Sequence, residues 1–154
     1  MSLAARIGVV RNVAAGAAVS YGGRWVAARP SRIATIPLGY ADGVPRTEPM
    51  AERGQLSVCG RRVSVAGAVC MDLLMGDVTD VPEARAGDEV TVFGDDPTAW
   101  DLADWAGTNA WQVLTGVGSR IPRVYVEDGR TVGIASPFLP AAAGDAKLRR
   151  RGEA

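Results

Sequence analysis

Two tyrosines stand in glycine-flanked loops, where a phenol can reach a ligand from a rigid scaffold. Tyr21 lies in the string VSYGG and Tyr40 in the string GYADG. A phenol acts as a general base only when its pKa falls, because under about 1% is ionised at pH 7 at the ordinary pKa of about 10. Arg24 and Arg46 are nearby cations that would lower the phenol pKa, and a partner domain could also supply such a cation. An amphipathic tyrosine at a loop or interface is the alternative interpretation.

The string VCMD at residues 69–72 offers a different group, a backbone amide. An exposed N–H at Met71 can hold a carboxylate through a charge-assisted hydrogen bond. The alternative is an ordinary strand, with Cys70 buried and Asp72 facing a loop. A pair of catalytic carboxylates has less support, because the spacing of the aspartates selects no pair and turns attract aspartate in any case.

The inventory of reactive side chains excludes several kinds of active site. The sequence has no His, so the chain alone cannot build a Ser-His-Asp triad, a Cys-His dyad or an imidazole metal site. Its single Lys, Lys147, lies near the C-terminus, which excludes a buried amine nucleophile. Cys59 and Cys70 are too few for a disulfide framework or a four-cysteine zinc site. We therefore expect no metal, and two free thiols in a reducing compartment.

The composition is that of one soluble globular domain. The chain has 154 residues, 47% hydrophobic and 22% charged, and its formal net charge is zero. Zero net charge gives no drive towards nucleic acid or an anionic membrane. The chain opens without a secretory leader and contains no apolar run near the roughly 20 residues of a membrane span. We expect a cytoplasmic protein that binds neither nucleic acid nor membrane.

The candidate side chains need elements to position them, and the dominant period of two predicts that these elements are mostly strands. Turn signals at Gly60 and at Asp128-Gly129 predict two hairpins. The predicted strands are residues 5–12, 24–28, 32–38, 55–59, 62–66, 69–79, 89–93, 125–126 and 131–134.

Helical spacing is confined to one stretch near residues 97–115. Asp96 can cap a helix there, Pro97 suits its first position and Gly107 ends it. Thr108 can then cap a second short helix. The fold class predicted is mainly all-β: a closed or nearly closed antiparallel, Greek-key-like barrel with this helical insertion. We expect the domain to cover residues 5–137, followed by a flexible tail at 138–154.

Several strings resemble, in order and spacing, the C-terminal β-domain of alanine racemases, which are fold-type III pyridoxal phosphate enzymes. The resemblance runs from about residue 5 to residue 135. The strings are VSYG (19–22), RIATIPLGYADGVPR (32–46), VAGAVCMDLLMGDVTDVP (65–82), AGDEVTVFG (86–94) and RIPRVY (120–125).

The resemblance implies an activity for the whole enzyme. Alanine racemases interconvert L-alanine and D-alanine, which supplies D-alanine for peptidoglycan. They are homodimers that use pyridoxal 5′-phosphate, and each subunit has an N-terminal (β/α)8 barrel whose lysine forms the Schiff base. The β-domain of one subunit completes the active site of the other. The partners implied are therefore the cofactor barrel, the second subunit and a small amino-acid substrate.

The resemblance also implies roles for single residues. Tyr21 matches the base that acts on L-alanine, opposite the lysine of the barrel. Met71 matches the position whose backbone N–H meets the substrate carboxylate. Tyr40, Arg46 and Asp72 match residues that line the substrate access channel.

Two positions depart from the usual family pattern. Ala68 stands where the family often has arginine, and Trp111 stands where it often has a tyrosine that gates the channel. A racemase for serine, or for a broader range of amino acids, is therefore an alternative function. A stand-alone β-barrel binding module is another, and it gains if Tyr21 and Tyr40 lie at opposite ends of the barrel.

The printed sequence contains no cofactor barrel, and Lys147 lies beyond the β-domain. We therefore expect the chain alone to bind no pyridoxal phosphate tightly and to be inactive.

Overall fold

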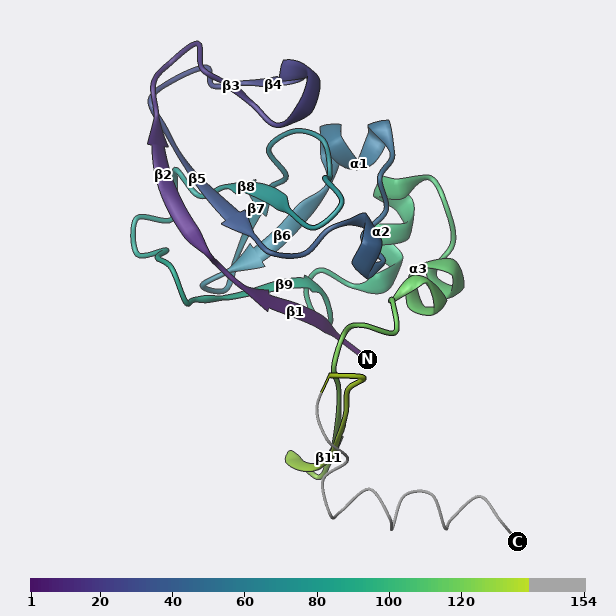
Figure 1. Cartoon of the computed structure of the whole chain (residues 1–154). Helices are drawn as coiled ribbons and strands as arrows, with labels where there is room; N and C mark the ends of the chain where they lie inside the picture. The colour runs from purple at the N-terminus through teal and green to yellow at the C-terminus, as the bar shows by residue number, and fades with distance from the viewer. Residues whose placement is uncertain (139–154) are drawn as a thin grey trace, which may run out of the picture. The chain divides into compact units, whose positions relative to one another are not determined.

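A computed structural model describes residues 1–138. The chain divides into two compact units, Met1–Val117 and Gly118–Ala154 (Figure 1). Most of the predicted tail, residues 139–154, lies outside the described residues. The single domain predicted over residues 5–137 stays a prediction.

The first unit is built on antiparallel strands. One sheet has the order β1 (Leu3–Arg6), β9 (Glu89–Phe93), β6 (Gln55–Val58) and β7 (Arg61–Ser64). A second sheet has the order β2 (Val9–Val13), β5 (Ser31–Ile36) and β8 (Leu74–Asp77). A short hairpin pairs β3 (Ala18–Val19) with β4 (Trp25–Val26). The mainly β class predicted from the sequence is confirmed.

The two larger sheets join at two places. The predicted strand 5–12 is divided at residues 7 and 8, where the chain leaves β9 and turns to β5. There Ile7 N–H donates to the carbonyl of Asp88 and Gly8 N–H to that of Thr35, each at 2.9 Å. The second place is between the end of β7 and β8, where a single bridge pairs Val65 with Gly76. No sheet of the described residues closes on itself, so the closed or nearly closed barrel is not confirmed.

The predicted hairpin of residues 55–59 and 62–66 is confirmed as β6 and β7. Its turn, Cys59-Gly60, has φ of 51° and 72°, as a two-residue turn between twisted strands requires. The prediction of a strand over 69–79 is wrong in its first half. Residues 66–73 form an irregular loop with bends, in which the N–H of Cys70 donates to the carbonyl of Leu73 at 2.8 Å, and β8 begins only at Leu74.

The predicted helical insertion is confirmed as α2 (Ala99–Ala106) and α3 (Ala110–Gly116). Their caps are Thr98 and Asn109, not the predicted Asp96 and Thr108. We did not predict α1 (Glu48–Arg53), although Thr47, which caps it, and Pro49 in its first turn are typical of a helix start. Two short 3-10 turns, η1 (Tyr21–Gly23) and η2 (Tyr40–Asp42), also belong to the first unit.

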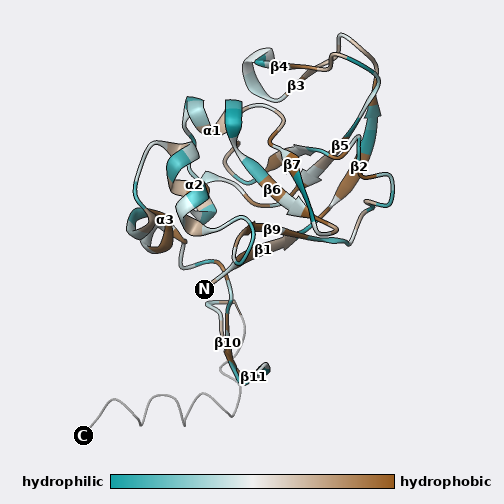
Figure 2. Cartoon of the chain, turned by 180° about the vertical axis from the view of Figure 1, so that it is seen from behind, coloured by the Kyte–Doolittle hydropathy of each residue, from teal (hydrophilic) through white to brown (hydrophobic). Residues whose placement is uncertain are grey.

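The core of the first unit lies between the sheets and the helices. Alternate residues of β6 are buried, with Leu56 and Val58 fully covered, as the period of two requires. On α2, Leu102 and Ala106 are buried, and Figure 2 shows hydrophilic and hydrophobic residues side by side along this helix. The largest fully buried side chains are Phe93, Ile36, Met50, Leu56, Leu74 and Leu102.

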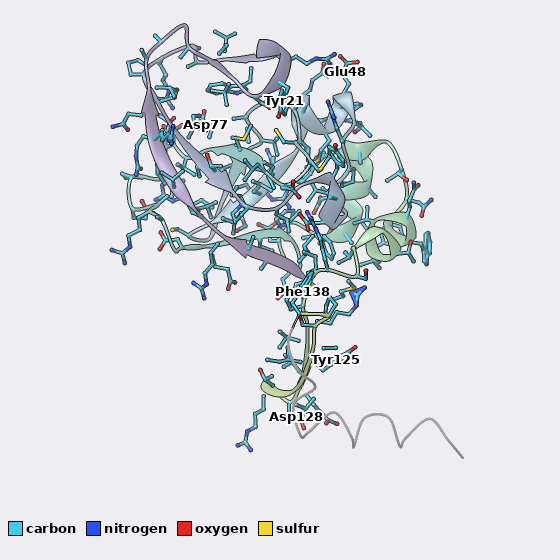
Figure 3. The ribbon with its side chains drawn as sticks, viewed as in Figure 1. Tyr21, Glu48, Asp77, Tyr125, Asp128 and Phe138 are labelled. Atoms are coloured by element: carbon cyan, nitrogen blue, oxygen red, sulfur yellow. The ribbon has the colours of Figure 1, made fainter. Side chains whose placement is uncertain are left out.

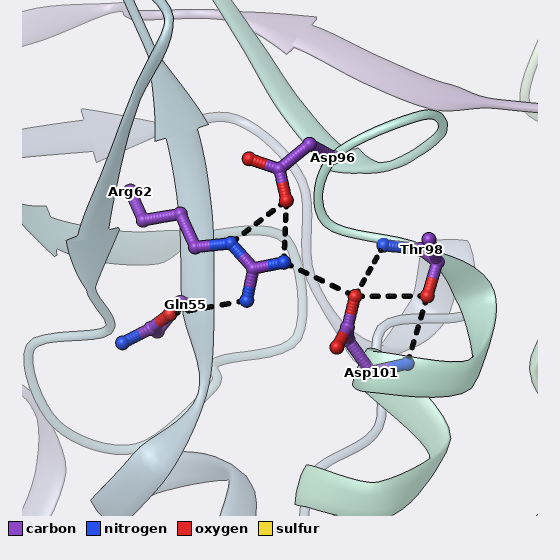
Figure 4. A network of polar contacts seen from close by, with 5 residues as sticks. All are labelled: Gln55, Arg62, Asp96, Thr98 and Asp101. Carbon is purple, nitrogen blue, oxygen red and sulfur yellow. Dashed lines mark hydrogen bonds and ion pairs between the residues drawn. The ribbon is translucent and has the colours of Figure 1, made fainter.

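A polar network joins α2 to the first sheet (Figure 4). Arg62 on β7 donates to the carboxylates of Asp96 and Asp101, the latter at 3.2 Å. Asp101 also accepts from the N–H and the hydroxyl of Thr98, each at 2.8 Å. This explains the shifted cap, because Asp96 pairs with Arg62 while the Thr98 hydroxyl accepts from the N–H of Asp101 at 3.1 Å. The bonds from Thr98, and then Arg62, lower the pKa of Asp101.

In the second unit, β10 (Arg123–Glu127) pairs with β11 (Arg130–Ala135). The turn residues Asp128 and Gly129 have φ of 49° and 73°. The hairpin predicted from this dipeptide is confirmed.

The lowered pKa of Asp101 predicts a pH dependence of stability. Asp101→Asn should lower the free energy of unfolding at pH 7 by about 0.5 kcal/mol, because an anion is lost from the first turn of α2. A carboxylate with a lowered folded pKa stabilises the fold above its unfolded pKa of about 3.9 and loses that effect as pH falls through the folded value. Denaturant unfolding at pH 7 and pH 3 measures this.

The matched control is Asp95→Asn, at an exposed aspartate for which the described residues provide no hydrogen bond or ion pair. Removing a surface charge away from such contacts leaves stability nearly unchanged. An Asp101→Asn deficit of the same size at both pH values would contradict the assignment.

Candidate functional site

Tyr21 lies at the tip of the β3–β4 hairpin, in η1. The next two residues, Gly22 and Gly23, have φ of 74° and 58°, which suits glycine and makes the turn tight. The Tyr21 side chain is 68% exposed. Beside it, Arg24 forms an ion pair with Glu48 of α1, and Figure 3 shows Tyr21 and Glu48 on these neighbouring elements.

Tyr40 lies in η2, a turn that is stabilised by the buried carboxylate of its last residue, Asp42. Asp42 is 4% exposed and accepts from the N–H of Gly39 at 2.8 Å. The guanidinium of Arg46 lies over the Tyr40 ring, 5.5 Å from its centre. Two of the predicted channel residues are therefore in direct contact, as a cation and an aromatic face.

A pocket of about 320 Å³ opens beside Tyr40 and Arg46. Residues 43–47 form one wall of it. The other wall comes from α2, α3 and the turn between them, through Ala106, Thr108, Gln112, Val113 and Gly116. The lining therefore contains one cation, Arg46, and mostly small or apolar residues besides.

Met71 lies in the irregular loop that precedes β8. Its side chain is 54% exposed, and its N–H donates to no acceptor within residues 1–138. Asp72, the next residue, is also exposed. The Met71 N–H therefore has no acceptor within residues 1–138, and its role in binding a carboxylate stays a prediction.

Residues 66–73, which we call the hub segment, hold both tyrosine loops. The Ser20 hydroxyl, next to Tyr21, donates to the carbonyl of Ala68 at 2.7 Å. The N–H of Tyr40 donates to the carbonyl of Cys70 at 3.0 Å. The N–H of Ala41 donates to the carbonyl of Met71, also at 3.0 Å. Three segments far apart in the sequence therefore meet at one place.

Glycine permits these close approaches. A β-carbon on Gly39 would lie 2.3 Å from the carbonyl oxygens of Cys70 and Met71. One on Gly43 would lie 2.4 Å from the carbonyl oxygen of Gly116, at the end of α3. Contacts this short do not occur, so a side chain at either position would force the backbones apart.

The predicted site residues fall into two groups. The loops of Tyr21 and Tyr40 both bond to the hub segment, which contains Met71. These bonds place the loops and not the phenol side chains, so the stand-alone binding module stays an alternative. Trp111 has a ring contact with Trp100, which it meets edge to face, with centres 5.2 Å apart and an interplanar angle of 86°. Its position on α3 is next to the pocket-lining Gln112, but Trp111 does not line the pocket.

Sequence reasoning missed Ser20, Gly39 and Asp42. Ser20 and Gly39 stand directly before the two tyrosines, and that adjacency was the available signal. Their contacts join residues far apart in the chain, which local patterns do not record.

The described residues offer few groups for a metal or an amine-linked cofactor. Within residues 1–138 no three His, Cys, Asp or Glu side chains are grouped to hold a metal ion. Lys147 lies outside that range. No helix in the described part of the chain combines the length and apolar character needed to cross a bilayer.

Comparison with known proteins decides the family. Residues 1–125 match the family described as "Alanine racemase, C-terminal domain". The chain belongs to this family. The alanine racemase of Sorangium cellulosum is 48% identical over 126 residues, which are 77% of this chain and 33% of that protein. The biosynthetic alanine racemase of Pseudomonas aeruginosa is 45% identical over 125 residues, 81% of this chain and 34% of that protein.

Solved alanine racemase structures agree with the sequence comparison. The Clostridium difficile enzyme, in complex with cycloserine, superposes with a TM-score of 0.82 at 34% identity, over 90% of this chain and 36% of that one. The biosynthetic enzyme of Pseudomonas aeruginosa gives a TM-score of 0.77 at 44% identity, over 82% and 35%. The alanine racemase C-terminal domain described here thus spans about a third of the length of its relatives.

The hub segment generates a prediction about stability. Gly39→Ala should lower the free energy of unfolding by about 3 kcal/mol, because its β-carbon overlaps two backbone carbonyls that cannot move independently. Denaturant unfolding of the 154-residue chain measures the loss.

Gly116→Ala is the control, since the nearest atom to its added β-carbon is 3.9 Å away. A Gly39→Ala chain as stable as the Gly116→Ala chain would show that the two loops do not approach as closely as described.

Proposed function

We propose that this chain supplies one side of an alanine racemase active site, with Tyr21 as a proton-transfer group and the Met71 amide as a carboxylate contact. The observation that carries the proposal is the hydrogen bond between Ser20 and Ala68. It joins the loop of the exposed Tyr21 to the segment that carries Met71, whose N–H has no acceptor within residues 1–138. A phenol and a free amide on joined loops can address two parts of one small amino acid.

Tyr21 exchanges a proton with the substrate Cα from one face. Its exposure and its tight turn let the hydroxyl reach a substrate held outside this chain. A phenol needs a cation nearby to work as a base at neutral pH. Arg24 is already paired with Glu48, so the cation that activates Tyr21 comes from another part of the enzyme.

The other residues bind and admit the substrate. The Met71 N–H donates to the substrate carboxylate, which fixes the amino acid relative to Tyr21. Arg46 and Tyr40, in contact with each other, line the route by which the anionic end of the substrate arrives. We assign Asp72 and Trp111 to the same access channel.

The described residues do not fit the anchoring of pyridoxal phosphate, the cofactor that the family resemblance implies. Residues 1–138 contain no lysine, so the described chain offers no amine for a Schiff base. When bound, the cofactor supplies the electron-withdrawing group that makes the Cα–H acidic. We place it, with the second base, on a (β/α)8 barrel, and we propose that this barrel belongs to the partner subunit of a homodimer.

Tyr21→Phe, introduced into the full enzyme that carries this domain, should lower racemisation in both directions at least about 100-fold, because one of the two proton-transfer groups is lost. Cofactor absorbance should not change. The Cα hydrogen of D-alanine should still exchange in deuterated water, while that of L-alanine should not. Polarimetry and NMR measure the two effects.

Tyr125→Phe serves as the control, since Tyr125 lies in the separate β10–β11 hairpin. Unchanged rates in the Tyr21→Phe enzyme would rule out the role of Tyr21. Serine assayed beside alanine tests the alternative substrate that Ala68 and Trp111 leave open.

The 154-residue chain alone, mixed with L-alanine and pyridoxal phosphate, should cause no change in optical rotation, because it lacks the second base and the anchoring amine. Lys147→Ala controls for an unexpected contribution of the single lysine. Turnover that survives this substitution would refute the division of the active site between two regions.

A further inference from the structure

We propose that Ser20 is a positioning residue, which sets the direction of the Tyr21 side chain by tying its loop to the hub segment. The inference rests on the proposed role of Tyr21. Ser20 is proposed to touch neither substrate nor cofactor, so it acts indirectly, through the position of Tyr21.

The backbone of Ser20 has a conformation that side chains rarely adopt. Its φ is 66° and its ψ is 179°, a region that belongs almost only to glycine. Within residues 1–138, Cys59 and Asp128 are the other non-glycine residues with positive φ, and both lie in two-residue hairpin turns where that value is ordinary. Ser20 is in no such turn, so other contacts must hold its conformation.

Those contacts come from the hub segment. The Ser20 hydroxyl donates to the Ala68 carbonyl at 2.7 Å and lies 3.7 Å from the Cys70 sulfur. Gly67 leaves the room for this approach, because a β-carbon there would lie 2.7 Å from the Ser20 β-carbon and 3.0 Å from the Val19 oxygen. Only the backbone of residue 68 takes part, so the tie is independent of which side chain stands there.

The hydrogen bond from Ser20 to Ala68 affects the direction of Tyr21 more than the stability of the fold. The ψ of Ser20 sets the plane of the peptide that leads into Tyr21, so a change at Ser20 re-aims the phenol. The hairpin itself is held elsewhere, because Val19 and Trp25 pack on a buried cluster that contains Ile33 and Ala66. Loss of the hydroxyl should therefore displace Tyr21 without unfolding the domain.

Two substitutions in the full enzyme separate the backbone from the hydrogen bond. Ser20→Ala removes the hydroxyl and keeps a β-carbon that disfavours the observed φ. Ser20→Gly also removes the hydroxyl, but glycine adopts this conformation freely. Ser64→Ala, at an exposed serine of β7, is the matched control.

We expect Ser20→Ala to lower kcat and the solvent exchange of the L-alanine Cα hydrogen at least tenfold. The KM, the exchange of the D-alanine Cα hydrogen and the cofactor absorbance should stay within twofold of the unsubstituted enzyme. The kcat and the L-alanine exchange of the Ser20→Gly enzyme should lie between those of the Ser20→Ala enzyme and the unsubstituted enzyme. Ser64→Ala should change nothing. If Ser20→Ala does not fold, Ser20→Gly must still show a loss confined to L-alanine exchange.

Equal losses on both substrate faces, or no loss in either Ser20 variant, would overturn the inference. Tyr21→Phe is measured in parallel. If it loses L-alanine exchange while both Ser20 variants retain it, the proposed function stands and only the positioning role fails. If Tyr21→Phe is fully active, the proposed function fails first.

Discussion

The loops of Tyr21 and Tyr40 lie so close to the hub segment that a β-carbon would not fit at the points of contact. Glycine is therefore required there. Gly39 and Gly67 both lie against neighbouring backbone or β-carbons with no room for a β-carbon of their own. The hydrogen bonds to the carbonyls of Ala68, Cys70 and Met71 form because of that closeness. The missing side chains of these two glycines therefore allow the approach that positions both tyrosine loops against the segment carrying Met71.

Local patterns predicted much of the scaffold and little of this junction. The β6–β7 and β10–β11 hairpins follow from alternation and turn dipeptides, which act between near neighbours. The cap predicted at Asp96 is wrong because Arg62, distant in sequence, takes Asp96 as its partner. The cap predicted at Thr108 is one residue early, because the Asn109 side chain accepts from the N–H of Gln112. The strand predicted over 69–79 failed because its first half accepts hydrogen bonds from other loops instead of joining a ladder. The chain passes from one sheet to the other at residues 7 and 8, and the sequence did not predict this because alternation continues there although the pairing partner changes.

The residues themselves singled out Tyr21, Tyr40 and the Met71 amide, but their roles came from the family resemblance, since composition alone described a β domain with few reactive groups. The fold explains why this scarcity suits the chain. Buried polar groups such as Asp42 and part-exposed ones such as Asp101 are used to hold turns and helix ends. In the proposed function, Tyr21 and the Met71 amide have little chemistry of their own and act when another region of the enzyme presents a substrate.

The engagement of three carbonyls within four residues limits how the length of the hub segment can change. Insertion or deletion of one residue between 67 and 72 would turn each acceptor away from its donor, so both loops would detach together. The turns at Gly60 and Gly87 have open space around them, with no atom within 4 Å of an added β-carbon. Length variation among homologous sequences should therefore gather at such turns, while the hub segment keeps a fixed number of residues.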